Sequence, residues 1–75
     1  MPRIHDSLTT LVAEVDQILP SFGLAFLVGQ DGCDWVVTRS TPGPGLQALV
    51  EGRRVRLDIE DEAGVLLATR YETLD

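Results

Sequence analysis

Residues 54–60 alternate strictly between charged and apolar side chains, and this alternation constrains the fold more than any other feature of the sequence. Val55, Leu57 and Ile59 hold every second position, with arginines and acids between them. A period of two places one side of a β-strand on a core and the other side in water. An acidic turn at residues 61–64 then returns the chain into a second apolar run, residues 65–71. This segment predicts a β-hairpin in which Val55, Leu57 and Ile59 point inward.

A similar pattern lies in the middle of the chain. The apolar run of residues 23–28 ends at residues 29–32, whose pair Asp31-Gly32 is a strong hairpin-turn signal. Residues 33–38 follow and are rich in β-branched and aromatic side chains, which favour a strand. Prolines and glycines at residues 41–45 cannot continue a strand. We therefore expect a second hairpin and then a loop, closed by a turn or a single helical turn at residues 46–50.

Residues 7–19 fit two different structures, and the choice between them decides the topology. Asp6 or Ser7 is suited to cap a helix, and six apolar residues then fall on one stripe at helical spacing: Leu8, Leu11, Val12, Val15, Ile18 and Leu19. The same segment contains threonine and valine residues that are compatible with a strand. The rest of the chain supplies four strands, whose sheet needs another strand to close into a barrel. The local pattern favours the helix, whereas barrel closure favours the strand.

The length of 75 residues predicts one domain, residues 1–75, with its core at about residues 10–74. A chain this short buries only about 60% of its unfolded surface, which leaves little room for a large catalytic cleft. Apolar residues make up 44% of the chain and charged residues 24%, as in ordinary globular proteins. No apolar stretch approaches the roughly 20 residues that span a bilayer, and the first residues lack the apolar core of a signal peptide. We expect a soluble cytoplasmic protein that binds no membrane.

The ionisable residues argue against several classes of function. Six arginines, no lysine and twelve acids give a net charge of −6, whereas proteins that hold nucleic acid through its phosphates normally present a basic face. Cys33 is the only cysteine and His5 the only histidine, so we expect neither a disulfide within the chain nor a zinc site. The sequence contains no glycine-rich phosphate loop and no nucleophile with a neighbouring base. We expect no catalytic residues, no metal and no cofactor.

Five segments follow one another in a characteristic order. Val15, Ile18 and Pro20 precede the apolar residues 23–27, the turn at residues 30–32, the strand-like residues 34–40 and, last, residues 49–59. The order and spacing, over about residues 10–74, resemble the bacterial cold-shock domain, with a shortened loop of prolines and glycines. Residues 46–59, which include Leu-Val-Glu-Gly-Arg-Arg-Val-Arg-Leu-Asp-Ile, are the most specific part of the match.

The resemblance implies an all-β fold, a small five-stranded barrel of the OB type in which residues 10–19 form the first strand. The helical interpretation leads instead to an α+β fold with an N-terminal helix plus four antiparallel strands. In that fold, the helix and the two strands after it look like the opening of a roadblock-type dimerisation domain. We expect the barrel, because the family-like spacing from Val15 to Gly23 outweighs local helix propensity.

The resemblance also implies a surface for single-stranded RNA or DNA. On such barrels, aromatic side chains stack on the bases, each contributing about 1–3 kcal/mol, beside a groove of positive charge. The outward positions of the second and third strands, where the family carries these rings, here hold Leu24, Phe26, Val36, Thr38 and Arg39. Because only Phe26 keeps a ring, the resemblance predicts weak or residual binding.

Four more residues complete the candidate surface for nucleic acid or a partner. Phe22 is either an exposed ring or an apolar anchor of its loop. Trp35 stands where the family has an inward valine, and is either a core filler or barrel-end plug, or a stacking residue displaced by one position. Arg54 and Arg56 either face phosphates or form the solvated side of their strand.

The alternative function is a non-enzymatic module for protein interaction or self-association that has lost nucleic-acid binding. In this interpretation, Leu24, Phe26 and Val36 form an apolar patch for a protein partner or for a second copy in a homodimer. The net charge and the missing rings favour this alternative, whereas the resemblance alone favours nucleic acid.

Overall fold

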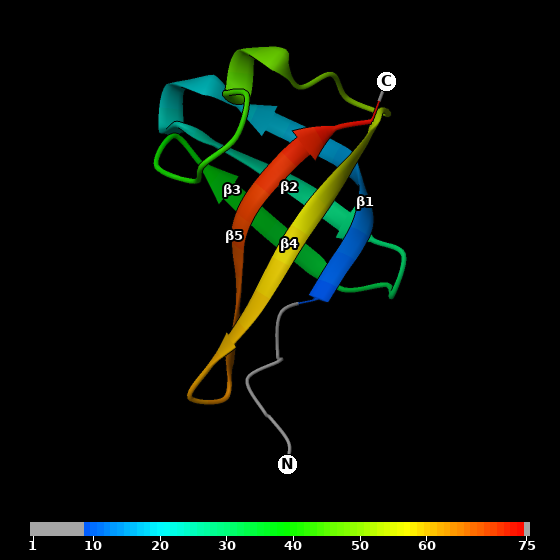
Figure 1. The fold of residues 1–75 in the computed structure, drawn as a ribbon. Helices are drawn as coiled ribbons and strands as arrows, with labels where there is room; N and C mark the ends of the chain where they lie inside the picture. The colour runs from blue at the N-terminus through cyan, green and yellow to red at the C-terminus, as the bar shows by residue number, and fades with distance from the viewer. Residues whose placement is uncertain (1–8, 75) are drawn as a thin grey trace.

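The computed structural model describes residues 9–74 of the chain, and these residues form a nearly closed barrel of five antiparallel strands (Figure 1). The strands lie along the sheet in the order β3-β2-β1-β4-β5. Their bounds are β1 Thr9–Leu19, β2 Leu24–Gly29, β3 Asp34–Thr38, β4 Arg54–Glu62 and β5 Val65–Thr73, with two short 3-10 helices, η1 Pro20–Phe22 and η2 Leu46–Ala48. The all-β, OB-like barrel and both predicted hairpins are confirmed.

The segment that fitted two structures is a strand, so the helix-plus-four-strand alternative is wrong for the described residues. β1 pairs with β4 through residues 9–14 and with β2 through residues 13–19. These two ladders, together with the burial of Ala13 and Val15 in the barrel, outweigh the helical spacing of the apolar residues, because tertiary pairing overrides weak local propensity. Asp6, Ser7 and Leu8, which belonged to the helical alternative, lie outside the described residues.

β1 contains a bulge at Asp16, where its register to β2 shifts between Val15 and Gln17. A bulge adds one residue to one strand of a pair, bends that strand and increases its twist. β1 leaves β4 after Glu14 and continues beside β2 as far as Leu19. The bend at Asp16 therefore lies where the first strand passes from one half of the barrel to the other.

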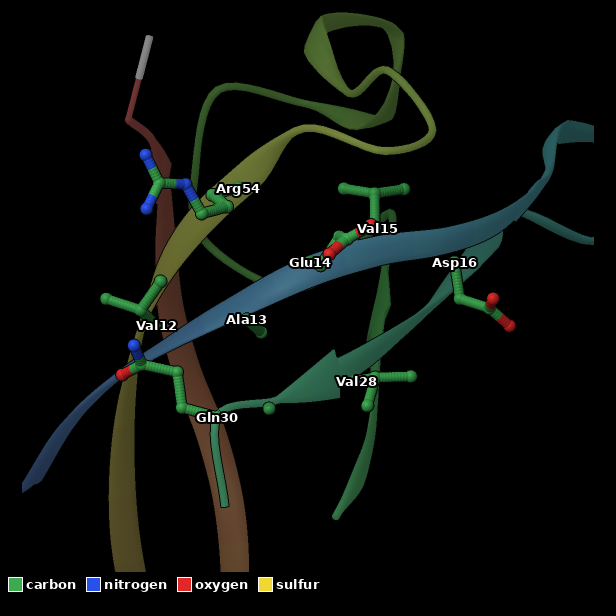
Figure 2. A pocket seen from close by; sticks show the side chains of 9 residues that line it. Val12, Ala13, Glu14, Val15, Asp16, Val28, Gln30 and Arg54 are labelled. Atoms are coloured by element: carbon green, nitrogen blue, oxygen red, sulfur yellow. The ribbon is translucent and has the colours of Figure 1, made fainter. Parts of the chain in front are cut away.

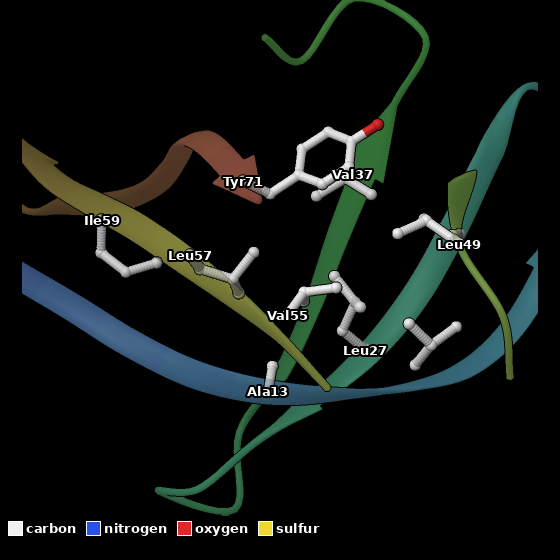
Figure 3. Packing of buried hydrophobic residues seen from close by; sticks show 10 residues of the cluster. Ala13, Leu27, Val37, Leu49, Val55, Leu57, Ile59 and Tyr71 are labelled. Carbon is white, nitrogen blue, oxygen red and sulfur yellow. The ribbon is translucent and has the colours of Figure 1, made fainter. Parts of the chain in front are cut away.

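The core fills the inside of this barrel (Figure 3). Val55, Leu57 and Ile59 are 1%, 0% and 5% exposed, which confirms that this side of β4 points inward. They pack with apolar side chains from the other strands and from the residue after η2: Ala13, Val15, Ala25, Leu27, Val37, Leu49 and Tyr71. Burial of apolar surface stabilises a fold by about 25 cal/mol per Å², so this cluster is what holds the strands together.

The β4–β5 hairpin extends beyond the rest of the barrel (Figure 1). Its turn is shorter than the acidic turn predicted at residues 61–64, because β4 continues through Glu62 and only Ala63 and Gly64 connect the strands. Both residues have positive φ, 56° and 86°, as a type I′ turn requires. Asp61 Oδ1 accepts a hydrogen bond from the Gly64 N–H at 2.9 Å and holds the turn.

The loop of prolines and glycines at residues 41–45 is joined to β5 by two hydrogen bonds. The N–H of Tyr71 donates to the Pro42 carbonyl at 3.1 Å, and the Tyr71 hydroxyl accepts a hydrogen bond from the Gly45 N–H at 3.1 Å. The predicted loop and the single helical turn after it are confirmed, the latter as η2. The loop thereby covers one part of the outer edge of β5.

Candidate interaction surface

The outward side of β2 and β3 carries a continuous apolar patch, which we call the platform: Leu24, Phe26, Val28 and Val36. Phe26 lies opposite Val36, and Leu24 lies opposite Thr38. Directly opposed residues of antiparallel strands place their side chains on the same face. Phe26, Val28 and Val36 are 36%, 40% and 42% exposed. Four of the predicted surface residues are therefore brought together: Leu24, Phe26, Val36 and Thr38.

The strands that carry the platform and its border contain no basic residue. From Thr9 to Thr38 the sequence has neither lysine nor arginine. Three exposed carboxylates, which we call the acidic row, stand at one end of the platform: Glu14, Asp16 and Asp34. Glu14 and Asp34 lie on either side of Val28, on β1 and β3. The platform therefore has an apolar centre and an anionic end, and that end repels phosphate groups.

Two residues of the acidic row, Glu14 and Asp16, line a pocket of about 320 Å³ (Figure 2). Val12 and Val28 supply apolar walls, Glu14 and Asp16 contribute carboxylates, and Arg54 contributes a guanidinium. Within residues 9–74, no hydrogen bond or ion pair engages the carboxylate of Glu14 or Asp16. A lysine or arginine side chain is complementary to this pocket. Its apolar stem can lie on the two valines, as such stems do on apolar surfaces, and its cationic head can reach the two carboxylates.

Of the two remaining aromatic candidates, one is exposed and the other faces the barrel. Phe22 lies in η1 with 74% of its surface exposed. Trp35 is partly buried and packs against the core. The Nε1 of Trp35 is buried and has no hydrogen-bond partner among the described residues. It lies so close to Gly29 that a Cβ built on this glycine would be 3.0 Å from it. Trp35 therefore packs against the core, on the opposite side of β3 from Val36.

Arg39 lies at the end of the platform opposite the acidic row. Its N–H donates to the Gly23 carbonyl at 3.0 Å, and its Nε would lie 2.5 Å from a Cβ built on Gly23. The side chain also lines a depression beside Ile18 and Leu46. The guanidinium is thus packed over the backbone between η1 and β2 rather than over Phe26.

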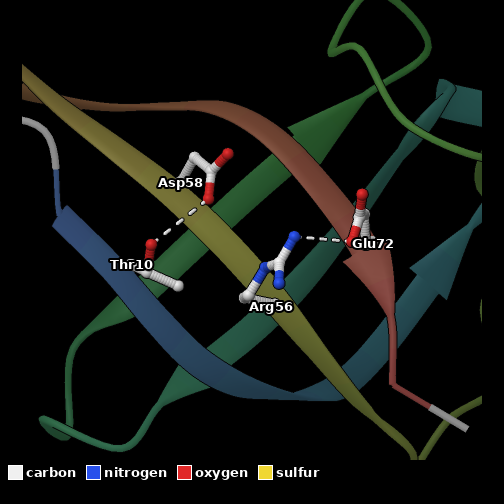
Figure 4. A network of polar contacts seen from close by, with 4 residues as sticks. All are labelled: Thr10, Arg56, Asp58 and Glu72. Carbon is white, nitrogen blue, oxygen red and sulfur yellow. Dashed lines mark hydrogen bonds and ion pairs between the residues drawn. The ribbon is translucent and has the colours of Figure 1, made fainter.

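Arg54 and Arg56 lie on β4, and Arg54 lines the pocket that Val28 of β2 also lines. Nη2 of Arg56 lies 2.6 Å from Oε1 of Glu72, in an ion pair between β4 and β5 (Figure 4). Arg54 lies opposite Glu14 of β1. An ion pair with Glu72 therefore engages Arg56, whereas Arg54 is only opposite Glu14 in the register. The predicted surface residues do not form one cluster.

No group of three or more histidine, cysteine, aspartate or glutamate side chains in residues 9–74 is placed to hold a metal ion. No helix in the same part of the chain has the length and apolar character needed to cross a membrane. Cys33 is exposed in the β2–β3 turn, and the neighbouring Asp31 carboxylate raises the pKa of its thiol.

Four residues of this surface were not among the predicted ones: Val28, Glu14, Asp16 and Asp34. The sequence could have predicted Val28, because this residue continues the alternation of Leu24 and Phe26 along one strand. The sequence could not have predicted Glu14 and Asp16 in this way, because they lie beside Val28 only when β1 is a strand that pairs with β2 in this register. Their place depends on contacts between distant segments.

Neither a protein-family model nor a curated protein matches this chain. The resemblance to the cold-shock domain therefore rests on the residues that carry it. A barrel of this kind hosts many unrelated functions, so function has to be argued from the surface itself.

Proposed function

We propose that the protein is a non-enzymatic interaction module that binds a cationic protein surface through the platform and the acidic row. One observation carries the proposal: an exposed apolar patch and three carboxylates share strands that have no basic residue. Apolar patches rimmed by polar residues are typical of protein interaction sites. Opposite charges across an interface accelerate encounter and exclude wrong partners.

The pocket beside the acidic row defines what the partner presents. Val12 and Val28 accommodate the stem of a lysine or arginine, and Glu14 and Asp16 accept hydrogen bonds from its head. Phe26, the largest side chain of the platform, packs against an apolar residue next to that cation. The partner therefore presents a basic side chain beside an apolar one.

A blocked peptide with arginine next to leucine, titrated into nitrogen-15-labelled protein, tests this proposal. We expect saturable shifts at the amides of Glu14, Val28 and Asp34. The double variant Glu14→Gln, Asp16→Asn weakens binding about tenfold, which corresponds to about 1.4 kcal/mol. The matched control Glu62→Gln, at the hairpin tip, leaves the affinity unchanged. Equal affinity for the neutralised variant and the parent would contradict the proposal.

A second candidate is a cold-shock-like function, namely weak binding of single-stranded RNA or DNA. The exposed rings of Phe22 and Phe26 favour it, because each stacked ring contributes about 1–3 kcal/mol. The acidic row and the absence of basic residues from β1, β2 and β3 oppose it. For either function we propose a cytoplasmic location, which the single cysteine favours because no disulfide within the chain is available.

A further inference from the structure

We propose that the open edge of β5 binds an extended cationic segment of a partner protein as an added β-strand. The groove beside this edge shares Val36 with the platform and Asp34 with the acidic row. The strand edge itself is formed by residues 65–68, so the proposal does not require the platform to bind anything. It rests on three observations: an unpaired strand edge, an apolar groove beside that edge, and several carboxylates around the groove.

The edge of β5 is covered at one end and open at the other. β3 and β5 are the two edge strands of the sheet. At Tyr71 the edge is covered, because its N–H donates to the Pro42 carbonyl. Over residues 65–68, no described backbone hydrogen bond outside the β4–β5 ladder reaches the strand. Unpaired N–H and C=O groups along an edge are a template for another strand.

A groove of about 470 Å³ lies between this open edge and β3, lined by residues 33–36 and 66–68. Leu66 and Leu67 are 57% and 45% exposed, and Trp35 forms part of the β3 side. Edge strands commonly prevent pairing with another strand by carrying prolines or charged side chains. Residues 65–69 contain neither. An added strand would place every second side chain against this apolar surface.

The charges around the groove select the occupant. Asp34 lines the groove on the β3 side, and Glu60, Asp61 and Glu62 stand opposite residues 67, 66 and 65 on the hairpin. Residues 31–38 and 57–69 contain neither lysine nor arginine. A second copy of this chain would bring another net charge of −6, which repels the first. A strand with alternating apolar and basic residues complements both the groove and its border.

Trp35, the single tryptophan, makes binding in the groove measurable through its fluorescence. The probe is a blocked peptide of about six residues, the usual length of a strand, that alternates lysine and valine. One control peptide alternates glutamate and valine, and a second carries the lysines and valines on an N-methylated backbone. We expect a saturable change with the first peptide alone, and weaker binding as salt is raised.

Three variants locate the site on the protein. Leu66→Asp weakens peptide binding about tenfold, the change that about 1.4 kcal/mol produces. Val50→Asp is the matched control, because Val50 is 55% exposed and lies outside the groove. It leaves the affinity unchanged, and so does Phe26→Asp on the platform. Melting curves of all three variants confirm that each remains folded.

Several results would overturn the proposal. The first is equal binding of the glutamate peptide, and the second is undiminished binding to Leu66→Asp. If Phe26→Asp abolishes binding and Leu66→Asp does not, the peptide occupies the platform, which supports the proposed function and removes this one. If sedimentation shows a dimer that salt strengthens and Leu66→Asp disperses, the occupant of the edge is a second copy.

Discussion

Gly43 lies so close to Tyr71 that a Cβ built on it would be 2.5 Å from Cε1 of the tyrosine ring. Carbon atoms pack favourably at about 3.5–4.0 Å, so Gly43→Ala forces the loop away from β5. The hydrogen bonds from Tyr71 to Pro42 and from Gly45 to Tyr71 are then strained. We expect the free energy of unfolding in denaturant to fall by about 1–3 kcal/mol.

Tyr71→Phe is the companion variant, because it removes the hydroxyl that accepts from Gly45 and keeps the ring. Its expected cost is about 1 kcal/mol, the net contribution of one hydrogen bond. A Gly43→Ala variant as stable as the parent would show that the loop does not pack on the ring.

Leu57 is 0% exposed at the centre of β4. Leu57→Ala removes buried methyl groups and leaves a cavity, which costs about 2–5 kcal/mol. A loss of that size is a large part of the stability of a small domain. The control Leu74→Ala concerns a residue that is 43% exposed, and we expect a change within about 0.5 kcal/mol. A melting temperature of Leu57→Ala close to that of the parent would contradict the inward register.

Trp35 combines apolar contacts with a buried Nε1 that has no partner among the described residues. An unpaired buried donor costs about 1–3 kcal/mol, and Trp35→Phe removes this cost while it keeps a ring. We expect Trp35→Phe to stay within about 1 kcal/mol of the parent, whereas Trp35→Ala loses at least about 2 kcal/mol through the cavity. Denaturant unfolding measures both. Equal losses would mean that the Nε1 has a partner in solution.

Cys33 is exposed, and its thiol has a raised pKa. The Asp31 carboxylate raises the pKa of Cys33, first by its charge and then as a hydrogen-bond acceptor, with smaller effects from desolvation and Asp34. A raised pKa lowers the fraction of thiolate, which is the nucleophile. At mildly alkaline pH we expect iodoacetamide to alkylate Cys33 slowly, and Asp31→Asn to accelerate the reaction.

The Asp31→Asn variant keeps an oxygen for the hydrogen bond that the Cys33 N–H donates at 3.0 Å, so the turn is preserved. The pH dependence of alkylation, followed by mass spectrometry, shifts to lower pH in the variant. Identical profiles for variant and parent would show that Asp31 does not control the thiol.

Local patterns predicted the two hairpins and the inward side of β4. Period-two alternation in residues 54–60 is a direct consequence of a strand with one buried side, so Val55, Leu57 and Ile59 could be placed without a structure. The pair Asp31-Gly32 likewise marks the β2–β3 turn by its own backbone preference.

Features that depend on pairing between distant segments could not be predicted in this way. β1 has a helical apolar stripe, and only its ladders to β2 and β4 make it a strand. The register of β4 against β5 pairs Arg56 with Glu72, so a residue that was a candidate for phosphate binding is already engaged. The resemblance to the cold-shock domain was needed to choose the barrel, because local propensity pointed to a helix.

The absence of basic residues from β1, β2 and β3, together with the acidic row, supports the proposal that the platform binds proteins rather than nucleic acid. The most direct test is a titration with labelled single-stranded DNA and RNA at low and physiological salt. We predict a dissociation constant weaker than about 10 μM at physiological salt, near the non-specific range of roughly 10⁻⁴ to 10⁻⁶ M. Binding at nanomolar concentration with little dependence on salt would show that the protein has a nucleic-acid site.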